Sequence, residues 1–127
     1  MTRHSSDEAI LFALRQVANV AQLTITAARD WSMTGLQQGQ YAADVMVNDA
    51  VTASLGEFGW GILSEESGVS GYTASRPEDL DDDLVVIVDP IDGSTNASRG
   101  IPWHAVSLCC VDRDGARAAV VSQLAAP

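Results

Sequence analysis

The sequence predicts an α+β fold, with two helices followed by a mostly antiparallel sheet in one domain over residues 1–127. In the first half, apolar residues recur at steps of three and four, which is typical of amphipathic helices. In the second half, short apolar runs rich in β-branched residues alternate with turn-forming residues, which is typical of strands. A chain of 127 residues is long enough to bury a core of its own.

Two helices are predicted before residue 60. The first covers residues 6–29, because an S-x-x-E capping box at Ser5–Glu8 precedes a periodic apolar pattern. A polar loop with two glycines follows, and the second helix covers residues 41–58. Five residues of this second helix are predicted to share one stripe: Ala42, Val45, Asp49, Thr52 and Leu55.

Four strands are predicted after the helices, over residues 60–63, 84–88, 105–111 and 116–124. The unbroken β-branched run of the second strand indicates that it is covered on both faces. Residues 69–83 are predicted to form a loop, whose acidic run is a solvated turn. Asp112–Gly115 predicts a hairpin between the last two strands, since Asp-Gly favours a tight turn.

The charge balance narrows the possible functions. The net charge is −10 and all seven basic residues are arginine, so no lysine of this chain serves as a nucleophile or binds a phosphate. The acidic balance disfavours nucleic-acid binding, which depends on a basic surface. An acidic protein that handles an anionic substrate usually relies on a bound divalent metal. No apolar run approaches the roughly 20 residues of a membrane span, so we expect no membrane partner and a cytoplasmic location.

The stretch Leu84–Asn96, with the sequence LVVIVDPIDGSTN, carries the strongest chemical signal. A buried strand delivers Asp89 at its carboxyl end, and Pro90 is expected to force a turn that returns Asp92 toward Asp89. The carbonyl of Ile91 lies in the bend between the two carboxylates. Two carboxylates and a carbonyl suit Mg²⁺, which prefers oxygen ligands.

The residues after Asp92 favour a phosphate site. Gly93 permits close approach to the backbone, and the N–H groups of Gly93, Ser94 and Thr95 are placed to open a helix and cradle a phosphate. The same segment also makes an ordinary turn, in which aspartate side chains only cap backbone groups. The motif by itself leaves both interpretations open.

A second acidic element, Glu65 and Glu66, follows the short strand over residues 60–63. If that strand lies in the same sheet as residues 84–88, Glu65 can reach Asp89. Paired acidic residues at a strand end are otherwise common in surface turns. Whether Glu65 and Glu66 belong to a site with Asp89 therefore depends on how these two strands are arranged.

These motifs resemble those of the inositol monophosphatase family. Ser64–Ser67 (SEES) is similar to the G-E-E-S element of that family, and Asp89–Asn96 (DPIDGSTN) is similar to its D-P-I-D-G-T-T-N signature. The P-x-x-A-V-S pattern of residues 102–107 also fits. The resemblance covers most of the chain beyond Tyr41. It implies the N-terminal half of an αβαβα layered sugar-phosphatase-like fold.

The resemblance implies Mg²⁺-dependent hydrolysis of phosphate monoesters. One metal would be held by Glu65, Asp89 and the carbonyl of Ile91, and a second would sit between Asp89 and Asp92. The residues that would contact the phosphate or substrate are Asp92, Gly93, Ser94 and Thr95.

The resemblance also assigns catalytic roles to Ser94, Asp49 and Glu65. Ser94 stands where the family usually has Thr, and its hydroxyl would help to orient the attacking water. Asp49 matches the acidic partner of that hydroxyl, although Asn48 replaces the Thr that often precedes it. The alternative for Asp49 is a solvent-facing helix acid. His104 is tempting as a general acid, but an ordinary structural role fits its place at a strand start better.

The sequence departs from the family after Asp92. Family members carry a later Trp-Asp motif that completes the second metal site, and no residue of this chain matches it. One hypothesis is a phosphatase for a small phosphorylated polyol or sugar, with inositol phosphates as the leading class. Related phosphatases act on fructose bisphosphate, histidinol phosphate or phosphoadenosine phosphate. Another hypothesis is an inactive fragment or split half, with a homodimer or the missing C-terminal half as partner.

Overall fold

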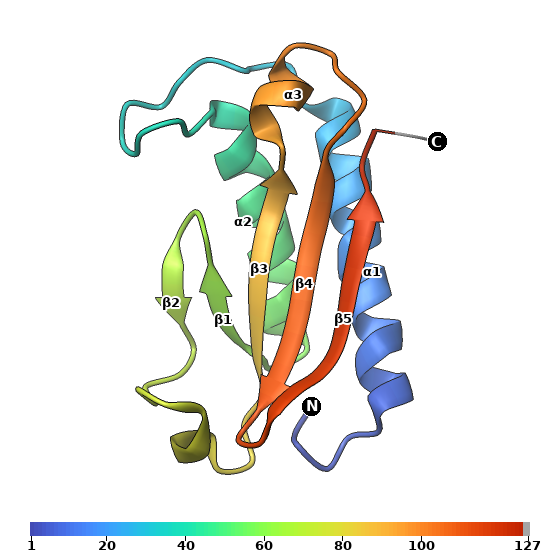
Figure 1. The fold of residues 1–127 in the computed structure, drawn as a ribbon, viewed down its shortest axis with the longest axis vertical. Coiled ribbons are helices and arrows are strands. Elements are labelled where there is room, and N and C mark those ends of the chain that lie inside the picture. Colours follow the sequence, from blue (N-terminus) through green and yellow to red (C-terminus); the bar gives the residue numbers. More distant parts are fainter. Residues whose placement is uncertain (126–127) are drawn as a thin grey trace.

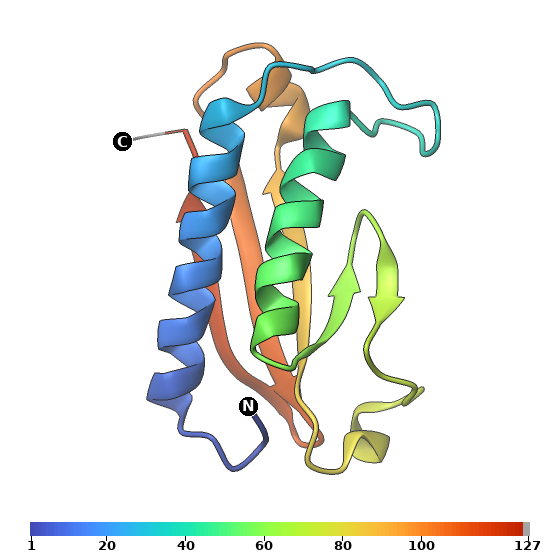
Figure 2. The ribbon, with the colours of Figure 1, turned by 180° about the vertical axis from the view of Figure 1, so that it is seen from behind.

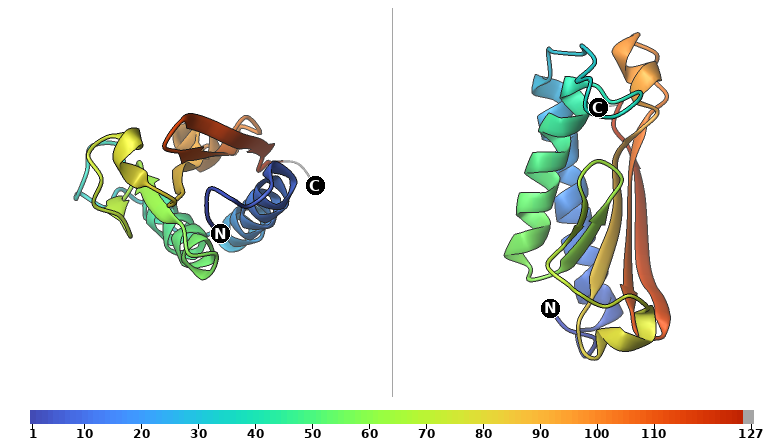
Figure 3. Two further views of the ribbon diagram at one scale, coloured as in Figure 1. Left: turned by 90° about the horizontal axis from the view of Figure 1, so that it is seen from below. Right: turned by 90° about the vertical axis from the view of Figure 1, so that its left-hand side faces the viewer.

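Two long helices cover one face of a five-stranded sheet (Figure 1). The computed structural model describes residues 1–125. Helix α1 spans Asp7–Ala27 and helix α2 spans Ala42–Glu57. Figure 2 shows them side by side in front of the sheet, and Figure 3 shows the two layers edge-on. The predicted α+β class is confirmed.

The sheet has the strand order β2-β1-β3-β4-β5. Strands β1 and β3 are parallel, whereas the other three neighbouring pairs are antiparallel, so the prediction of a mostly antiparallel sheet is confirmed. The β4–β5 hairpin forms at the predicted Asp-Gly signal, with Asp112 opposite Gly115. The strands are β1 (Gly61–Ser64), β2 (Gly68–Ser70), β3 (Val85–Asp92), β4 (Ala105–Asp112) and β5 (Gly115–Gln123).

Residues 69–83 contain more regular structure than the sequence predicted. The edge strand β2 pairs with β1, and a 3₁₀ turn, η1, spans Pro77–Leu80. All three residues of β2 are exposed, which explains why this strand has no apolar run. A strand at the edge of a sheet needs only one neighbour and no buried face, so its sequence is weakly constrained.

Helix α1 begins after Ser6, whose side chain accepts a hydrogen bond from the backbone N–H of Ala9. By length and mean hydropathy alone α1 qualifies as a membrane span, so the expectation that no stretch approaches that length is wrong. Core helices of soluble proteins pass the same test. Here Ile10, Leu14 and Val17 are fully buried in the core between the helices and the sheet.

The buried face of α2 differs from the predicted stripe. The apolar residues Val47, Val51 and Leu55 recur four residues apart and are fully buried. They determine which side of the helix meets the sheet, because burying these three side chains contributes more than burying Thr52 or Ala42. This orientation turns Asp49 into solvent and buries Asp44 and Asn48 instead.

The other face of the sheet is open in residues 1–125. Leu63, Ile87 and Val121 lie on this face, and their exposed fractions are 36%, 44% and 73%. The prediction that the strand over residues 84–88 is covered on both faces is therefore wrong within the described residues. One face of β3 packs on the helices, with Val86 and Val88 buried, and the face that carries Ile87 does not.

Candidate metal and phosphate site

The parallel pairing of β1 and β3 brings Glu65 to Asp89. Ser64 lies opposite Val88, and the backbone N–H of Glu65 donates to the carbonyl of Val88 at 3.1 Å. The carboxyl ends of parallel strands meet at the same edge of a sheet, so the residues that follow each strand are neighbours. One side-chain oxygen each from Glu65, Glu66 and Asp89 lies within 4.8 Å of the other two. The two strands therefore lie in the same sheet, which is the condition under which the sequence predicts that Glu65 reaches Asp89.

A bulge in β3 places Asp89 and Asp92 on the same side of the sheet. Asp89 pairs with Ser107 and Asp92 with Ala105, so three steps along β3 match two along β4. Without this extra residue, side chains three positions apart would point to opposite faces. Pro90 lies in the bulge, where its lack of an N–H is tolerated. The predicted turn at Pro90 is therefore wrong, because the strand continues to Asp92.

A small polar cavity of about 150 Å³ collects most of the predicted site residues. Thr95 is exposed and does not line it, and Asp49 does not line it either. The Tyr41 hydroxyl lies 3.3 Å from the Thr95 hydroxyl, so Thr95 helps to attach α3 to the start of α2. The cavity is lined by the predicted residues Glu65, Asp89, Ile91, Asp92, Gly93 and Ser94, and also by Glu66 and residues 37–40.

The backbone conformation at position 93, in the wall of the cavity, requires glycine. Its backbone angle φ is 90°, a conformation that residues with a side chain rarely adopt. A Cβ at this position would lie 2.8 Å from the carbonyl oxygen of Trp103 and 3.3 Å from Cβ of His104. The glycine therefore lets the chain turn tightly from β3 into α3 (Ser94–Ser98), and the predicted helix opening after Gly93 is confirmed.

The carboxyl group of Asp89 is in an unfavourable environment for its charge. Burial, followed by the nearby Glu65 and then the charges of Asp92 and Glu66, raises the pKa of Asp89 to about 8. Its Oδ1 is buried with no hydrogen-bond partner in residues 1–125. No arginine lines the cavity. The site thus concentrates negative charge that the described residues do not neutralise, and this arrangement suits a bound cation.

Asp44, rather than Asp49, is the acidic residue of α2 that faces this site. Its side chain is 1% exposed, and its Oδ2 accepts a hydrogen bond from the backbone N–H of Tyr41 at 2.8 Å. Burial raises the pKa of Asp44, whereas the Tyr41 N–H and the side chain of Ser94 favour the charged form. Asp49 is exposed one and a half turns later on the helix. The structure therefore brings Asp44, and not Asp49, close to Ser94, and the catalytic role expected of Asp49 stays a prediction.

The loop over residues 37–40 holds Glu66 and was not predicted to be part of the site. Gln40, which is buried, donates from Nε2 to Glu66 Oε2 at 2.5 Å. Gln37 donates from Nε2 to the Glu66 carbonyl at 2.9 Å. These contacts join residues 26 and 29 positions apart, so no local sequence pattern indicates them.

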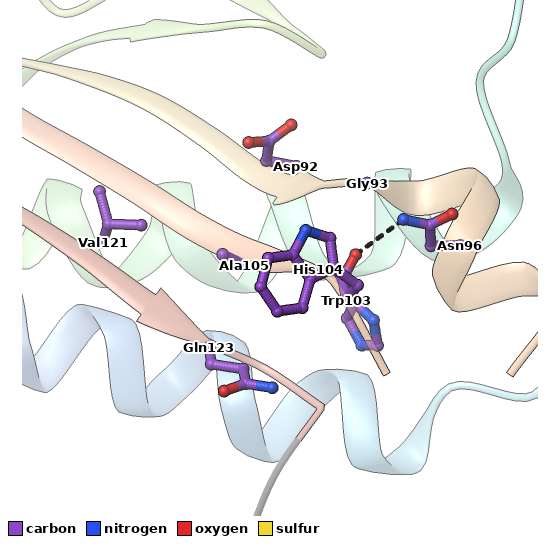
Figure 4. Close-up of a pocket in the computed structure, with 8 residues that line it drawn as sticks. All are labelled: Asp92, Gly93, Asn96, Trp103, His104, Ala105, Val121 and Gln123. Atoms are coloured by element: carbon purple, nitrogen blue, oxygen red, sulfur yellow. Dashed lines mark hydrogen bonds between the residues drawn. The ribbon is translucent and has the colours of Figure 1, made fainter. Parts of the chain in front are cut away.

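A larger hollow of about 520 Å³ adjoins the cavity on the other side of Asp92 and Gly93 (Figure 4). The indole of Trp103 lies across it, between Asp92 and Gln123, and is 77% exposed. The Asn96 side chain points toward Trp103 and donates to its carbonyl oxygen at 2.9 Å. His104 turns away from Asp92, with Nδ1 3.3 Å from the carbonyl oxygen of Ile101, which fits the structural role expected for it.

Sequence comparison identifies the family of this chain. A family model described as the inositol monophosphatase family matches residues 6–126. The chain belongs to the inositol monophosphatase family. The resemblance inferred from the SEES and DPIDGSTN segments is confirmed by this match.

Two characterised relatives carry names with related activities. A fructose-1,6-bisphosphatase/inositol-1-monophosphatase of Archaeoglobus fulgidus is 41% identical over 68 residues, which are 54% of this chain and 23% of that protein. A fructose-1,6-bisphosphatase of Pyrococcus furiosus is 37% identical over 71 residues, which are 56% of this chain and 25% of that protein. The matched region is thus a minor part of each relative.

Solved structures of the family share the fold. The extragenic suppressor protein suhB of Bartonella henselae superimposes with a TM-score of 0.72 at 25% identity, over 91% of this chain and 45% of that one. An inositol monophosphatase of Anabaena superimposes with a TM-score of 0.69 at 21% identity, over 92% and 40%. The chain spans less than half the length of these structures.

Proposed function

We propose that this chain provides metal- and phosphate-binding residues for the Mg²⁺-dependent hydrolysis of a phosphate monoester. The observation that carries the proposal is the convergence of Glu65, Glu66 and Asp89 where β1 ends beside β3, in a cavity shared with Asp92 and Ser94. Membership of the inositol monophosphatase family supports the same chemistry.

The donor set fits a hard divalent cation. Glu65 and Asp89 offer carboxylate oxygens, Ile91 lines the same cavity, and the orphaned Oδ1 of Asp89 lacks any other partner among residues 1–125. Oxygen donors of this kind suit Mg²⁺, and Asp92 provides a carboxylate for a second ion. Bound Mg²⁺ supplies positive charge that offsets the carboxylates and makes a coordinated water more acidic.

The remaining residues of the site bind the phosphate group and orient the attacking water. The backbone at Gly93 and Ser94 approaches the cavity closely and offers N–H groups to phosphate oxygens. The Ser94 hydroxyl orients the attacking water, and the buried Asp44, whose charged form the Ser94 side chain favours, is the acidic partner of that hydroxyl in place of Asp49. Thr95 supports this segment through its contact with Tyr41.

Inositol phosphates remain the leading substrate class, and sugar bisphosphates are the alternative suggested by the names of the relatives. The alcohol part of the ester would lie in the larger hollow beside Asp92 and Gly93, next to the Trp103 indole. The volume of this hollow is in the range of small-molecule sites. The side chains that line this hollow would determine which ring alcohols the site accepts.

The test is Mg²⁺-dependent release of phosphate from inositol 1-phosphate by the purified chain, together with a titration of Mn²⁺ as a spectroscopic substitute for Mg²⁺. We expect Asp89→Asn to abolish phosphate release and to weaken Mn²⁺ binding by at least about 100-fold, while the exposed Asp49→Asn changes neither by more than about twofold. Metal binding without phosphate release would favour the inactive-half hypothesis. Equal Mn²⁺ binding by wild type and Asp89→Asn would refute the metal site.

A further inference from the structure

The turn that carries Glu65 and Glu66 is fastened to α2 by one buried side chain, Asn48. The Oδ1 of Asn48 accepts a hydrogen bond from the Ser64 hydroxyl at 2.5 Å, and its Nδ2 donates to the Ser67 hydroxyl at 3.1 Å. Ser64 and Ser67 are the residues that flank the two glutamates. Both ends of the turn are thus bound to a single amide group.

The same network continues to the backbone of the turn. Besides donating to Asn48, the Ser64 hydroxyl accepts a hydrogen bond from the Glu66 backbone N–H at 3.1 Å. Asn48 is 3% exposed and Ser64 is 4% exposed, so water competes little for these bonds. A buried polar network in which the partners satisfy one another fixes a single local geometry.

Asn48 is a polar residue on a helix face whose other buried residues, apart from Asp44, are apolar. It lies beside Val47 and one turn from Val51, both of which are fully buried in the core. It is also one turn after Asp44, so that one edge of this face presents two buried polar side chains toward the site. Both hydrogen bonds of the Asn48 amide go to the two serines that flank the glutamates, so the amide joins this helix to the turn.

We infer that Asn48 is a positioning residue, which sets the carboxylates of Glu65 and Glu66 at the distance from Asp89 that a divalent cation requires. This inference rests on the metal centre proposed above. Gln40, in the loop before α2, donates a hydrogen bond to the Glu66 carboxylate, so the turn is held by two segments of the chain. Residues that orient metal ligands through hydrogen bonds typically change metal affinity by about 10- to 100-fold when they are replaced.

The experiment compares three variants of the full chain with wild type. Asn48→Ala removes both hydrogen bonds, Ser67→Ala removes one at an exposed residue that the fold does not depend on, and Val51→Ala destabilises the same helix face without touching the turn. Mn²⁺ affinity is measured by the electron paramagnetic resonance signal of the free ion. Thermal unfolding by circular dichroism reports stability separately.

We expect the Mn²⁺ dissociation constant to rise about tenfold in Asn48→Ala and about threefold in Ser67→Ala, and to change less than twofold in Val51→Ala. Luminescence lifetimes of bound Tb³⁺ in H₂O and D₂O should show about one additional coordinated water in Asn48→Ala, because a displaced carboxylate is replaced by water. A merely structural role would leave the water count unchanged.

The outcomes separate this inference from the proposed function. Unchanged affinity and water count in Ser67→Ala, and in Asn48→Ala if it folds, would overturn the positioning role of Asn48 while leaving the metal centre intact. Binding that is equal in wild type and Glu65→Gln would overturn the metal centre itself, and the role of Asn48 with it.

Discussion

Acidic side chains gather at both ends of the sheet, but among residues 1–125 arginine forms ion pairs with them at only one of these ends. Near the β4–β5 turn, Arg117 donates to Asp7 Oδ1 at 2.7 Å and to Asp112 Oδ2 at 3.3 Å. At the opposite end, where β3 meets α3, Glu65 and Asp89 line a cavity that no arginine lines (Figure 1). Asp7 and Asp112 are thus paired with an arginine within the chain, whereas Glu65 and Asp89 are not.

The pKa values of the two ends differ in direction. Burial would raise the pKa of Asp112, but the Asp114 backbone N–H and the Arg117 guanidinium outweigh burial and lower it. The pKa of Asp89 is raised to about 8, because burial and the neighbouring carboxylates act in the same direction. Uncompensated charge is costly in a fold, and it is a common feature of functional sites.

The largest effect on stability should come from Arg117→Met. This change leaves Asp112 buried without its cation and also removes the donors to the carbonyl oxygens of Arg3 and Ser5. We expect the free energy of unfolding at pH 7 to fall by about 2–3 kcal/mol, measured by urea denaturation. Mn²⁺ binding to the folded chain should not change, because the two ends of the sheet are independent.

The matched control is Arg113→Met, an exposed arginine in the same turn. This variant should lower the free energy of unfolding by less than about 0.5 kcal/mol. Equal losses for the two variants would show that the acids near the turn need no cation. A change in Mn²⁺ affinity in Arg117→Met would show that the two ends are coupled.

A smaller effect is expected from Asp44→Asn. Asn keeps the shape but not the charge of Asp44, to which we assign the orientation of the Ser94 hydroxyl, so Mg²⁺-dependent phosphate release should fall about tenfold, which corresponds to about 1.4 kcal/mol. The exposed Asp49→Asn is the control and should stay within about twofold of wild type. The reverse order, with Asp49→Asn the slower enzyme, would restore the assignment based on the family motif.

The contrast between Asp44 and Asp49 shows where sequence reasoning succeeds and fails. The gathering of residues from Asp89 to Ser94 at the cavity was predictable because these residues are adjacent and their motif is specific. Glu65 was predictable because it follows a strand directly. The choice between two aspartates of α2 depends on helix rotation, which is set by how Val47 and its apolar neighbours pack on the sheet.

Other parts of the site depend on contacts that no local pattern encodes. Gln40 and Asn48 reach the Glu65–Glu66 turn across long stretches of sequence, and each looks like an ordinary polar residue in isolation. The bulge in β3 was misread because a proline after a strand usually predicts a turn. The sequence therefore indicated most of the groups that gather at the candidate site, and the structure identified the groups that hydrogen-bond to the Glu65–Glu66 turn.

The smallest predicted effect is a pH dependence that arises from Asp89 alone. The pKa of its carboxyl is raised in the folded chain, so between about pH 4 and about pH 8 the folded state keeps a proton that the unfolded state releases. Without metal, the contribution of Asp89 to stability therefore declines as the pH rises through this window. Asp112 acts in the opposite sense, since its lowered pKa favours the fold above about pH 4 and this contribution is lost in acid.

Asp89→Asn isolates this contribution. We expect the metal-free variant to match wild type near pH 4 and to be more stable by about 1 kcal/mol at pH 8, measured by urea denaturation at both pH values. This is much less than the full pKa shift implies, because the carboxyl is only half-buried and solvent screens its charge. Added Mg²⁺ should cancel the difference by stabilising wild type alone, because the variant lacks the charge that binds the ion. Parallel pH profiles for the two proteins would mean that the charge of Asp89 is balanced within the chain, as the charge of Asp112 is.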